Sequence, residues 1–587
     1  MNSLDMNRVC RKDISIALSP QEKELFSILL QANSELQLHS TLRVAGGWVR
    51  DKILGMHSHD IDIAIDNMTG YEFVERLPSW LASRGYSTSN IGKIRANPDK
   101  SKHLETATIR INDSSIDFVN LRKEEYNDQS RIPTISIGTP LEDAYRRDLT
   151  INSLFYNINT NTIEDYTMRG VDDLRDRIAR TPLPPLETFQ EDPLRLLRTV
   201  RFATRYDCRI EPDIMTAAQD PGIELFLSRK VSRERIGVEV LKMAQGRDFA
   251  RAVRLLEDMN ILNSVFNIEG DNSNYLRTQK SRSLEEFNAG LFLIALPETA
   301  VGSASTLDAK YMNSFFASVD CDCAEYRVGE CEADKQLMNG THRYLSFIRE
   351  RVLRGVRMVQ VGEDLMSDPR VCEGWRDDVE AILQPIEDGW QAVLRLAHLL
   401  HFFSYSFLCG DMVFVVKKKV SHQNQVLSPL IKHFIRENLK LKNSMIDDVC
   451  WVVHRHHEIR PFLDMMKKQE EVALSEEELL SLGNLLFASK NLWPLMVVQA
   501  VVSEVWEGQD REEVMRAYGR LMQYVREKEL MRMWEIPSIV NGNELVTYGV
   551  KKGPGMKDVM DAIRNWMILH PHGTKEECVH EVLSYPK

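Results

Sequence analysis

The stretch that decides the fold is residues 42–65, which read LRVAGGWVRDKILGMHSHDIDIAI. Leu42–Ala45 is a short apolar run that ends at a pair of glycines, and a helical pattern follows the pair. Ile61, Ile63 and Ile65 then alternate with acidic residues, which is the period of a strand with one buried face. We therefore predict a strand, a glycine turn, a helix and a second strand.

The polar residues of this stretch indicate a ligand site. The pair Gly46 and Gly47 lets a ligand approach the backbone and presents free N–H groups with the helix dipole behind them, which suits a triphosphate, and Arg50 can add positive charge. Asp60 and Asp62 project from one face of the strand, so their carboxylates repel unless a cation lies between them. A lone Asp-x-Asp is usually an exposed strand end, but beside the glycine pair it predicts a divalent metal site.

The residues around this stretch predict a mixed α/β domain followed by helices. The expected elements are a helix over 21–38, strands over 106–111 and 116–121, a hairpin of 154–158 with 162–166, and helical stretches such as 379–403 and 474–487. The Pro-rich segment 181–185 separates the two parts. The stretch 300–345 is rich in Ser, Asn and Asp, and we expect it to belong to a loop-rich insertion at about 270–345.

Composition places the chain among globular proteins. Hydrophobic residues make up 43% and charged residues 27% of the 587 residues, and the net charge of −12 gives no bulk basicity that would point to nucleic acid. A local basic face would still allow RNA binding. Nine scattered cysteines favour free thiols in a reducing compartment. The longest uncharged apolar stretch, 492–502, is shorter than the roughly 20 residues that span a bilayer, so we expect a soluble protein.

A second cluster of charged residues is Arg146-Arg147-Asp148, which is followed by Leu-Thr-Ile and Asn152. A charged helix start would explain these residues structurally. The alternative is functional, because guanidinium groups match phosphate oxygens and a carboxylate can accept a hydrogen bond from a ribose hydroxyl.

A third cluster lies at residues 191–198, which read EDPLRLLR. Pro193 fits the first helical position, which makes Asp192 the N-cap. Asp192 and Arg195 are three residues apart and can share one helix face. Such a pair could read a base edge, the carboxylate accepting from an amine and the guanidinium donating to a ring nitrogen. Cytosine and adenine offer this pattern, whereas uracil and guanine present a carbonyl instead.

In this order and spacing, the three clusters resemble the CCA-adding enzymes, the class II tRNA nucleotidyltransferases of the DNA polymerase β superfamily. The eukaryotic branch is most similar, because HLETAT at 103–108 and VNLR at 119–122 look like its versions of those strands. The segment 232–236 is similar to the last head-and-neck motif, and 553–556 is similar to the start of the family's tail.

The resemblance implies four parts of the chain. They are a polymerase β-like α/β catalytic head over 1–166, a helical neck with the nucleotide-selecting motif over 167–250, a helical body over 251–450 with the loop-rich insertion at about 270–345, and a helical tRNA-binding tail over 451–587.

The resemblance also implies roles for individual residues. Asp60 and Asp62 would bind two Mg²⁺ ions, and Asp117, on a neighbouring predicted strand, is the candidate for a third catalytic carboxylate. The nucleotide-binding residues would be Gly46, Gly47, Arg50, Arg147, Asp148, Asn152, Asp192, Arg195 and Arg198. Glu191 and Arg201 would position them. Contacts to tRNA are expected from Lys417, Lys418, Lys419, Gly553 and Gly555, although a lysine run is usually only a solvated surface.

The predicted activity is the template-independent addition of C, C and A to the 3′ end of tRNA from CTP and ATP. The alternatives are a poly(A) polymerase with the same head and neck, and a catalytically silent RNA-binding relative, against which the intact Asp60 and Asp62 argue. We expect a monomer or weak dimer, no membrane partner, and a cytoplasmic or nuclear location. The first 20 residues carry Arg8, Arg11 and Lys12 and weakly suggest mitochondrial targeting as well.

Overall fold

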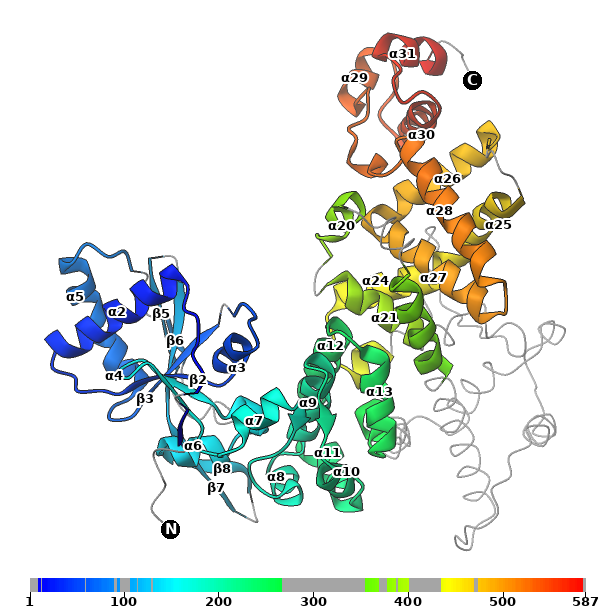
Figure 1. Ribbon diagram of the computed structural model, residues 1–587. Helices are drawn as coiled ribbons and strands as arrows, with labels where there is room; N and C mark the ends of the chain where they lie inside the picture. The colour runs from blue at the N-terminus through cyan, green and yellow to red at the C-terminus, as the bar shows by residue number, and fades with distance from the viewer. Residues whose placement is uncertain are drawn as a thin grey trace, which may run out of the picture. The chain divides into compact units, whose positions relative to one another are not determined.

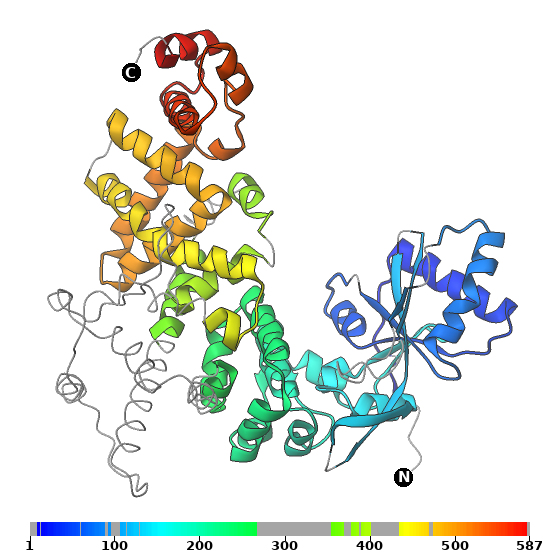
Figure 2. The same ribbon diagram turned by 180° about the vertical axis from the view of Figure 1, so that it is seen from behind.

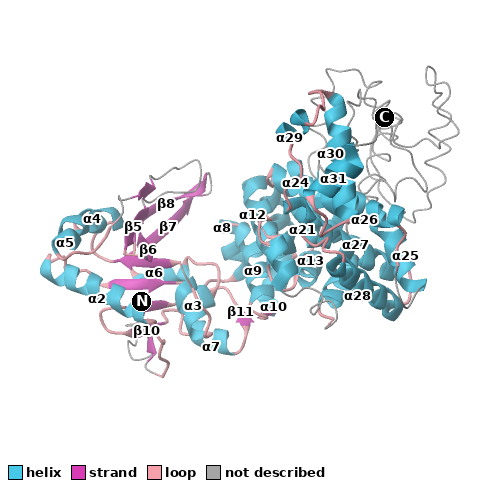
Figure 3. Cartoon of the chain, turned by 90° about the horizontal axis from the view of Figure 1, so that it is seen from above, coloured by secondary structure: helices cyan, strands magenta, loops and turns pink. Residues whose placement is uncertain are grey.

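The computed structural model describes residues 9–11, 13–58, 60–88, 92–94, 106–112, 114–127, 130–266, 354–368, 377–386, 389–400, 434–468 and 473–583. They fall in two compact units, one of Met1–Glu239 with Leu255–Val265 and the other of Val240–Arg254 with Phe266–Lys587. Within the described residues, strands lie only in the first unit, and the second is helical (Figures 1 and 3). The predicted insertion at 270–345 and Lys417–Lys419 lie outside the described residues.

The first unit is built on an eight-stranded mixed sheet in the order β1-β10-β9-β2-β3-β6-β5-β4. The strands are β1 (Cys10–Arg11), β2 (Leu42–Ala45), β3 (Ile61–Ile65), β4 (Gly92–Ile94), β5 (Thr106–Ile111), β6 (Ser114–Asn120), β9 (Phe155–Asn157) and β10 (Thr162–Glu164). Strands β3 and β6 are parallel, and all other neighbours in this sheet are antiparallel. A separate hairpin consists of β7 (Arg122–Asn127) and β8 (Ser130–Ile137). The predicted fold class is confirmed.

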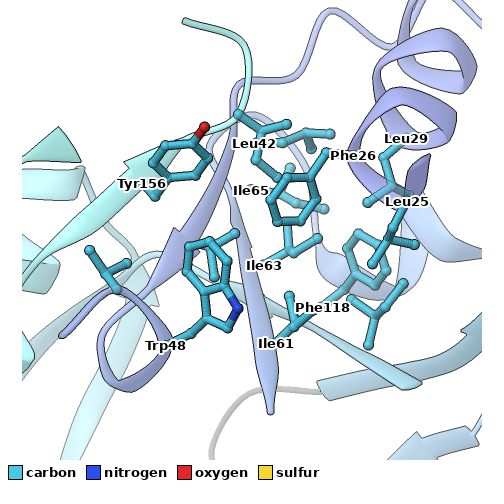
Figure 4. Packing of buried hydrophobic residues seen from close by; sticks show 14 of the residues in the cluster. Leu25, Phe26, Leu29, Leu42, Trp48, Ile61, Ile63, Ile65, Phe118 and Tyr156 are labelled. Carbon is cyan, nitrogen blue, oxygen red and sulfur yellow. The ribbon is translucent and has the colours of Figure 1, made fainter. Parts of the chain in front are cut away.

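Helices pack on the face of the sheet to which Ile61, Ile63 and Ile65 belong. They are α2 (Pro20–Glu35), α3 (Gly47–Ile53), α4 (Gly70–Glu75) and α5 (Leu77–Ser83). Figure 4 shows Trp48 beside both Phe26 and Tyr156, and the ring centroids of these two residues are 5.8 and 5.7 Å from that of Trp48. Because side chains alternate along a strand, Asp62 belongs to the opposite face. A second cluster, which includes Ala45, Ala64 and Phe155, forms there beside α6 (Pro140–Tyr145).

The core of the head continues into the neck. The main apolar cluster contains Phe202, Ala203 and Tyr206 together with the sheet residues, so the chain does not separate into two cores at the Pro-rich segment. The helices here are α7 (Gly170–Arg175), α8 (Pro185–Glu191), α9 (Leu194–Arg205), α10 (Pro212–Ala218), α11 (Pro221–Lys230), α12 (Arg233–Gln245), α13 (Phe249–Asp258) and α14 (Leu262–Phe266). The four-part division of the chain stays a prediction.

Two local predictions are wrong. The neck predicted over 167–250 is not entirely helical, because β11 (Ile178–Ala179) pairs in parallel with β12 (Arg209–Ile210), and two-residue strands are too short to show alternation. The helical stretch expected over 379–403 is broken between α20 (Asp377–Leu383) and α21 (Trp390–Leu400). The break contains Pro385 and Gly389, which has a φ of 87°.

Eight further α-helices of the second unit are coloured yellow to red in Figure 2. They are α24 (Asn443–Arg455), α25 (Arg460–Lys468), α26 (Glu476–Ser489), α27 (Trp493–Trp506), α28 (Arg511–Glu527), α29 (Gly542–Thr547), α30 (Pro554–Leu569) and α31 (Lys575–Leu583).

One helical stretch, Glu476–Trp506, which contains the uncharged stretch 492–502, is long and apolar enough by length and composition to cross a membrane. Of its most apolar window, 78% is buried inside the protein, as in a core helix. The stretch consists of α26 and α27, each of 14 residues, and Lys490 between them has a left-handed φ of 49°. Neither helix alone reaches about 20 residues.

Gly70 is required for the close approach of α4 to β6. A Cβ atom at Gly70 would lie 2.5 Å from the carbonyl oxygen of Phe118, which is backbone and has little room to move. We expect Gly70→Ala to lower the free energy of unfolding by about 1–3 kcal/mol, measured by urea denaturation. Gly519→Ala is the matched control, because Gly519 lies exposed in α28 with open space around it, and it should stabilise by about 0.5–1 kcal/mol. Equal stability of Gly70→Ala and the wild type would contradict the close packing.

Candidate active site

Two of the predicted catalytic carboxylates are neighbours in the sheet. Asp62 on β3 is in register with Asp117 on β6, and because the two strands are parallel, both side chains belong to the same face. Asp60 lies directly before β3. Thr108 on β5 donates a hydrogen bond of 2.6 Å to Oδ1 of Asp117 and so orients this carboxylate.

The electrostatics of this site favour a cation. Burial raises the pKa of Asp62, and the negative charges of Asp117 and Asp60 raise it further, while Arg147 opposes them. Among the described residues, no three or more His, Cys, Asp or Glu side chains form a group that could hold a metal ion. A carboxylate pair still fits Mg²⁺, which usually binds one or two carboxylates and completes its coordination with water and substrate phosphates.

The glycine turn is closed by the second cluster. Gly46 has a φ of 69°, and a Cβ atom there would lie 2.5 Å from Nη1 of Arg147. The backbone N–H of Gly46 donates to the carbonyl of Leu154 at 2.8 Å, so the prediction that the N–H groups of this turn are free is wrong for Gly46. Arg147 therefore supplies the positive charge beside the turn.

Asp143, which the sequence patterns did not reveal, holds the arginines of this cluster. Its carboxylate pairs with Arg146 at 2.5 Å and with Arg147 at 2.7 Å, and it also accepts from the N–H of Arg122. Burial works to raise the pKa of Asp143, but the charges of Arg147 and Arg146 outweigh it, so the pKa is lowered. The sequence did contain a signal for these pairs, because Asp143 precedes Arg146 by three residues and Arg147 by four, which is the spacing of ion pairs on a helix.

Asp148 and Arg198, both predicted to bind the nucleotide, bind each other. Nε of Arg198 on α9 donates to Oδ2 of Asp148 at 2.7 Å, and Asn152 and the N–H of Leu149 donate to Oδ1. Burial works to raise the pKa of Asp148, but Arg198 and these hydrogen bonds lower it to about 2. Arg50 is also internal. It is 4% exposed and binds Asp51 and Asn152, so contact with a triphosphate would require it to leave these partners.

The third cluster is arranged differently from the predicted pair. Helix α9 begins at Leu194, and its N-cap is Pro193 rather than the predicted Asp192. Asp192 precedes the N-cap and has extended dihedral angles. Its Oδ1 nevertheless accepts from the N–H of Leu194 at 3.1 Å, as a cap would. Arg195 binds Glu191 at 2.9 Å.

Two partners of this cluster come from α12 and were missed. Arg235 donates to Oδ2 of Asp192 at 2.9 Å, and Glu239 accepts from Arg201 at 2.5 Å. The spacing of 38 to 43 residues gives no local pattern that would reveal these pairs. The position of Arg235 in the segment 232–236, which resembles a family motif, was the available signal.

Two further predicted residues, Gly553 and Gly555, belong to the second unit. Gly553 is the N-cap of α30, and a Cβ atom at Gly553 or Gly555 would have open space around it. The second unit also contains a cavity of about 150 Å³ lined in part by Glu363, Arg395 and His398, and none of the predicted site residues lines it.

The pKa of Asp148 makes a prediction about stability. Because it lies near 2 in the folded protein against a usual 3.8, ionised Asp148 stabilises the fold above about pH 4, and this contribution is lost as the pH falls toward 2. We expect the pH-dependent part of the stability difference between wild type and Asp148→Asn to be about 2 kcal/mol above pH 5 and about half of that at pH 3. Urea denaturation at pH 7, 5, 4 and 3 measures it. A difference independent of pH would contradict the ion pair.

Comparisons with known proteins show which family this chain resembles. A family model described as the poly A polymerase head domain matches residues 42–180. The mitochondrial CCA tRNA nucleotidyltransferase of Saccharomyces cerevisiae is 49% identical over 237 residues, which is 40% of this chain and 43% of that protein. The crystal structure of the Bacillus stearothermophilus CCA-adding enzyme in complex with CTP has a TM-score of 0.50 and 18% identity, covering 97% of this chain and 98% of that one, which is a likeness of fold.

A relative of similar length decides the family. The mitochondrial CCA tRNA nucleotidyltransferase of Candida glabrata is 31% identical over 553 residues, and the match covers 93% of this chain and 90% of the relative. The chain therefore belongs to the CCA tRNA nucleotidyltransferase family.

Proposed function

We propose that this protein adds C, C and A to the 3′ end of tRNA from CTP and ATP without a nucleic-acid template. The observation that carries the proposal is the register of Asp62 with Asp117 in the same compact unit as α9, which begins just after Asp192 and contains Arg195. The carboxylates proposed for phosphoryl transfer and the residues proposed to read the base therefore belong to one compact unit. A polymerase that selects nucleotides without a template requires such a fixed arrangement.

Asp60 and Asp62 are proposed to hold two Mg²⁺ ions, with Asp117 as a further carboxylate. When bound, the ions supply a lowered pKa at the attacking 3′-hydroxyl and neutralise the charge of the departing pyrophosphate. Arg147, held by Asp143, adds fixed positive charge beside the glycine turn, where a triphosphate would lie. Thr108 keeps Asp117 oriented toward the side of the sheet that carries Asp62.

Base selection is proposed to involve Asp192 and Arg195. Both side chains already have protein partners, Arg235 and Glu191. A cytosine or adenine amine would share the Asp192 carboxylate with Arg235, which donates to Oδ2 and so orients this carboxylate. A carbonyl oxygen of uracil or guanine at the same place would meet a second acceptor, and this costs binding energy.

We further propose that the protein serves mitochondria, because the two eukaryotic relatives above are named mitochondrial. Any removal of a targeting segment would have to occur before Val9. Val9 is fully buried, its carbonyl accepts from the N–H of Asp165, and the next two residues form strand β1. A protein isolated from mitochondria whose N-terminus lies after residue 11 would contradict this limit on where a targeting segment can be removed.

The activity is tested by incubating the protein with tRNA that lacks its last three residues and with each of the four nucleoside triphosphates in turn. We expect incorporation with CTP alone, completion when ATP is added, and almost none with UTP or GTP. Poly(A) polymerase I of Haemophilus influenzae is 30% identical over 225 residues, so the shared head requires this control. Incorporation of ATP with negligible use of CTP would favour the poly(A) polymerase alternative.

Asp60→Ala and Asp62→Ala should each abolish the incorporation of both C and A, by several orders of magnitude, because the metal ions act in every addition. The fold should persist, since removing a carboxylate from this site relieves repulsion. The matched control is Asp66→Ala, which lies just after the same strand and accepts a hydrogen bond from the N–H of Thr41. This variant should keep its activity. Near-normal activity of Asp60→Ala or Asp62→Ala would remove that residue from the metal site.

Asp192→Ala should weaken the use of CTP and ATP together and should relax the rejection of UTP and GTP, with discrimination falling more than turnover. Asp192→Ser keeps an oxygen that can cap α9 but lacks the carboxylate, so it should show the same loss of selectivity. Asp220→Ala is the control, because Asp220 caps α11 through the N–H of Gly222 and should only cost about 1 kcal/mol of stability. Full selectivity of Asp192→Ser against UTP would reduce Asp192 to a helix cap.

A further inference from the structure

A chain of buried hydrogen bonds runs from α9 through the head and returns to α9. The hydroxyl of Tyr206, the residue that ends α9, donates to Oδ1 of Asp51 at 2.8 Å. Asp51 also accepts from Nε of Arg50 at 2.8 Å, and Nη1 of Arg50 donates to the side chain of Asn152. Asn152 donates to Asp148 at 3.0 Å, and Asp148 accepts from Arg198 on α9.

Aromatic contacts reinforce the same chain. The guanidinium of Arg50 lies 4.3 Å from the ring centroid of Tyr206 and 5.1 Å from that of Phe202. Phe202 also contacts the guanidinium groups of Arg198 and Arg201 at 5.4 and 4.0 Å. Tyr206 is 6% exposed, and burial raises the pKa of its hydroxyl to about 12, so it remains a donor at neutral pH.

We propose that Tyr206 is a positioning residue for nucleotide binding, acting through Asp51, Arg50 and Asn152 on Asp148. This inference rests on the proposed function. Through this chain, the C-terminal end of α9 orients the residues of the Arg-Arg-Asp cluster, while the N-terminal end of the same helix adjoins Asp192. The ribose-binding and base-reading residues are thereby held in a fixed relation.

The hydroxyl of Tyr206 is the part of this chain that can be removed without unfolding the protein. In Tyr206→Phe the ring still covers Arg50, and Oδ1 of Asp51 still accepts from Arg50, so no buried carboxylate is left without a partner. What is lost is the direct bond between α9 and Asp51. Hydrogen bonds in a buried chain polarise one another, so the loss also loosens Asn152 and Asp148.

The test is steady-state kinetics of Tyr206→Phe with CTP and with ATP on tRNA. We expect the KM for both nucleotides to rise about tenfold, the effect typical of losing a hydrogen bond to a charged group, with kcat within about twofold of wild type. A purely structural role would lower the amount of active enzyme, and hence kcat, while leaving KM unchanged. That outcome would overturn the inference and leave the proposed function intact, whereas absence of CTP incorporation by the wild type would overturn the proposed function.

Tyr156→Phe is the matched control. Tyr156 is a buried tyrosine of β9, and its hydroxyl donates to Asn161 in the hairpin turn rather than to a residue linked to α9. It should leave both KM values unchanged. A double-mutant cycle of Tyr206→Phe with Asp148→Asn then tests the chain itself. The two effects on KM should be clearly less than multiplicative if the residues act through one another, and independent multiplication of the two effects would contradict the proposal.

Discussion

The ion pair between Asp148 and Arg198 is the interaction on which the geometry of the proposed site depends. A buried carboxylate is costly unless it is paired and hydrogen-bonded, and Asp148 has three donors, one of which comes from α9. Satisfying this charge therefore requires that α9 stay against the head. The shared apolar cluster, to which Phe202 and Tyr206 belong, makes the same demand through packing. The sheet and α9 are consequently held together by both packing and an ion pair.

Most charged residues of this region form ion pairs, whereas two carboxylates, Asp62 and Asp117, repel each other. Asp143 forms ion pairs with Arg146 and Arg147. Glu239 forms ion pairs with Arg198 and Arg201, so all four guanidinium groups are held in place by carboxylates of the protein. Asp62 and Asp117, in contrast, lie side by side on one face of the sheet, and Arg147 opposes the effect of Asp117 on the pKa of Asp62. A divalent cation bound at these carboxylates would relieve their repulsion, and the neighbouring arginines have the charge and geometry to bind a triphosphate.

Local patterns predicted the parts of this site that depend on local chemistry. The strands around Asp60 and Asp62, the glycine turn and the existence of α9 follow from periodicity and turn residues, and the structure has β2 and β3 where they were expected. Partners distant in the chain could not be predicted in this way. Asp192 and Arg195 are spaced to pair with each other, yet Asp192 binds Arg235 and Arg195 binds Glu191, because α12 packs beside the start of α9. Arg50 stays a predicted phosphate ligand, but no local pattern indicated that Asn152 binds its guanidinium and that the ring of Tyr206 covers it.

A crystal structure of the protein with CTP and Mg²⁺ would test this arrangement most directly. We expect electron density for metal at Asp60 and Asp62, the triphosphate beside Arg147, and the cytosine edge within hydrogen-bond distance of the Asp192 carboxylate and the Arg195 guanidinium, with Asp148 still bound to Arg198. A cytosine whose edge contacts neither Asp192 nor Arg195, or a metal held away from Asp60 and Asp62, would contradict it.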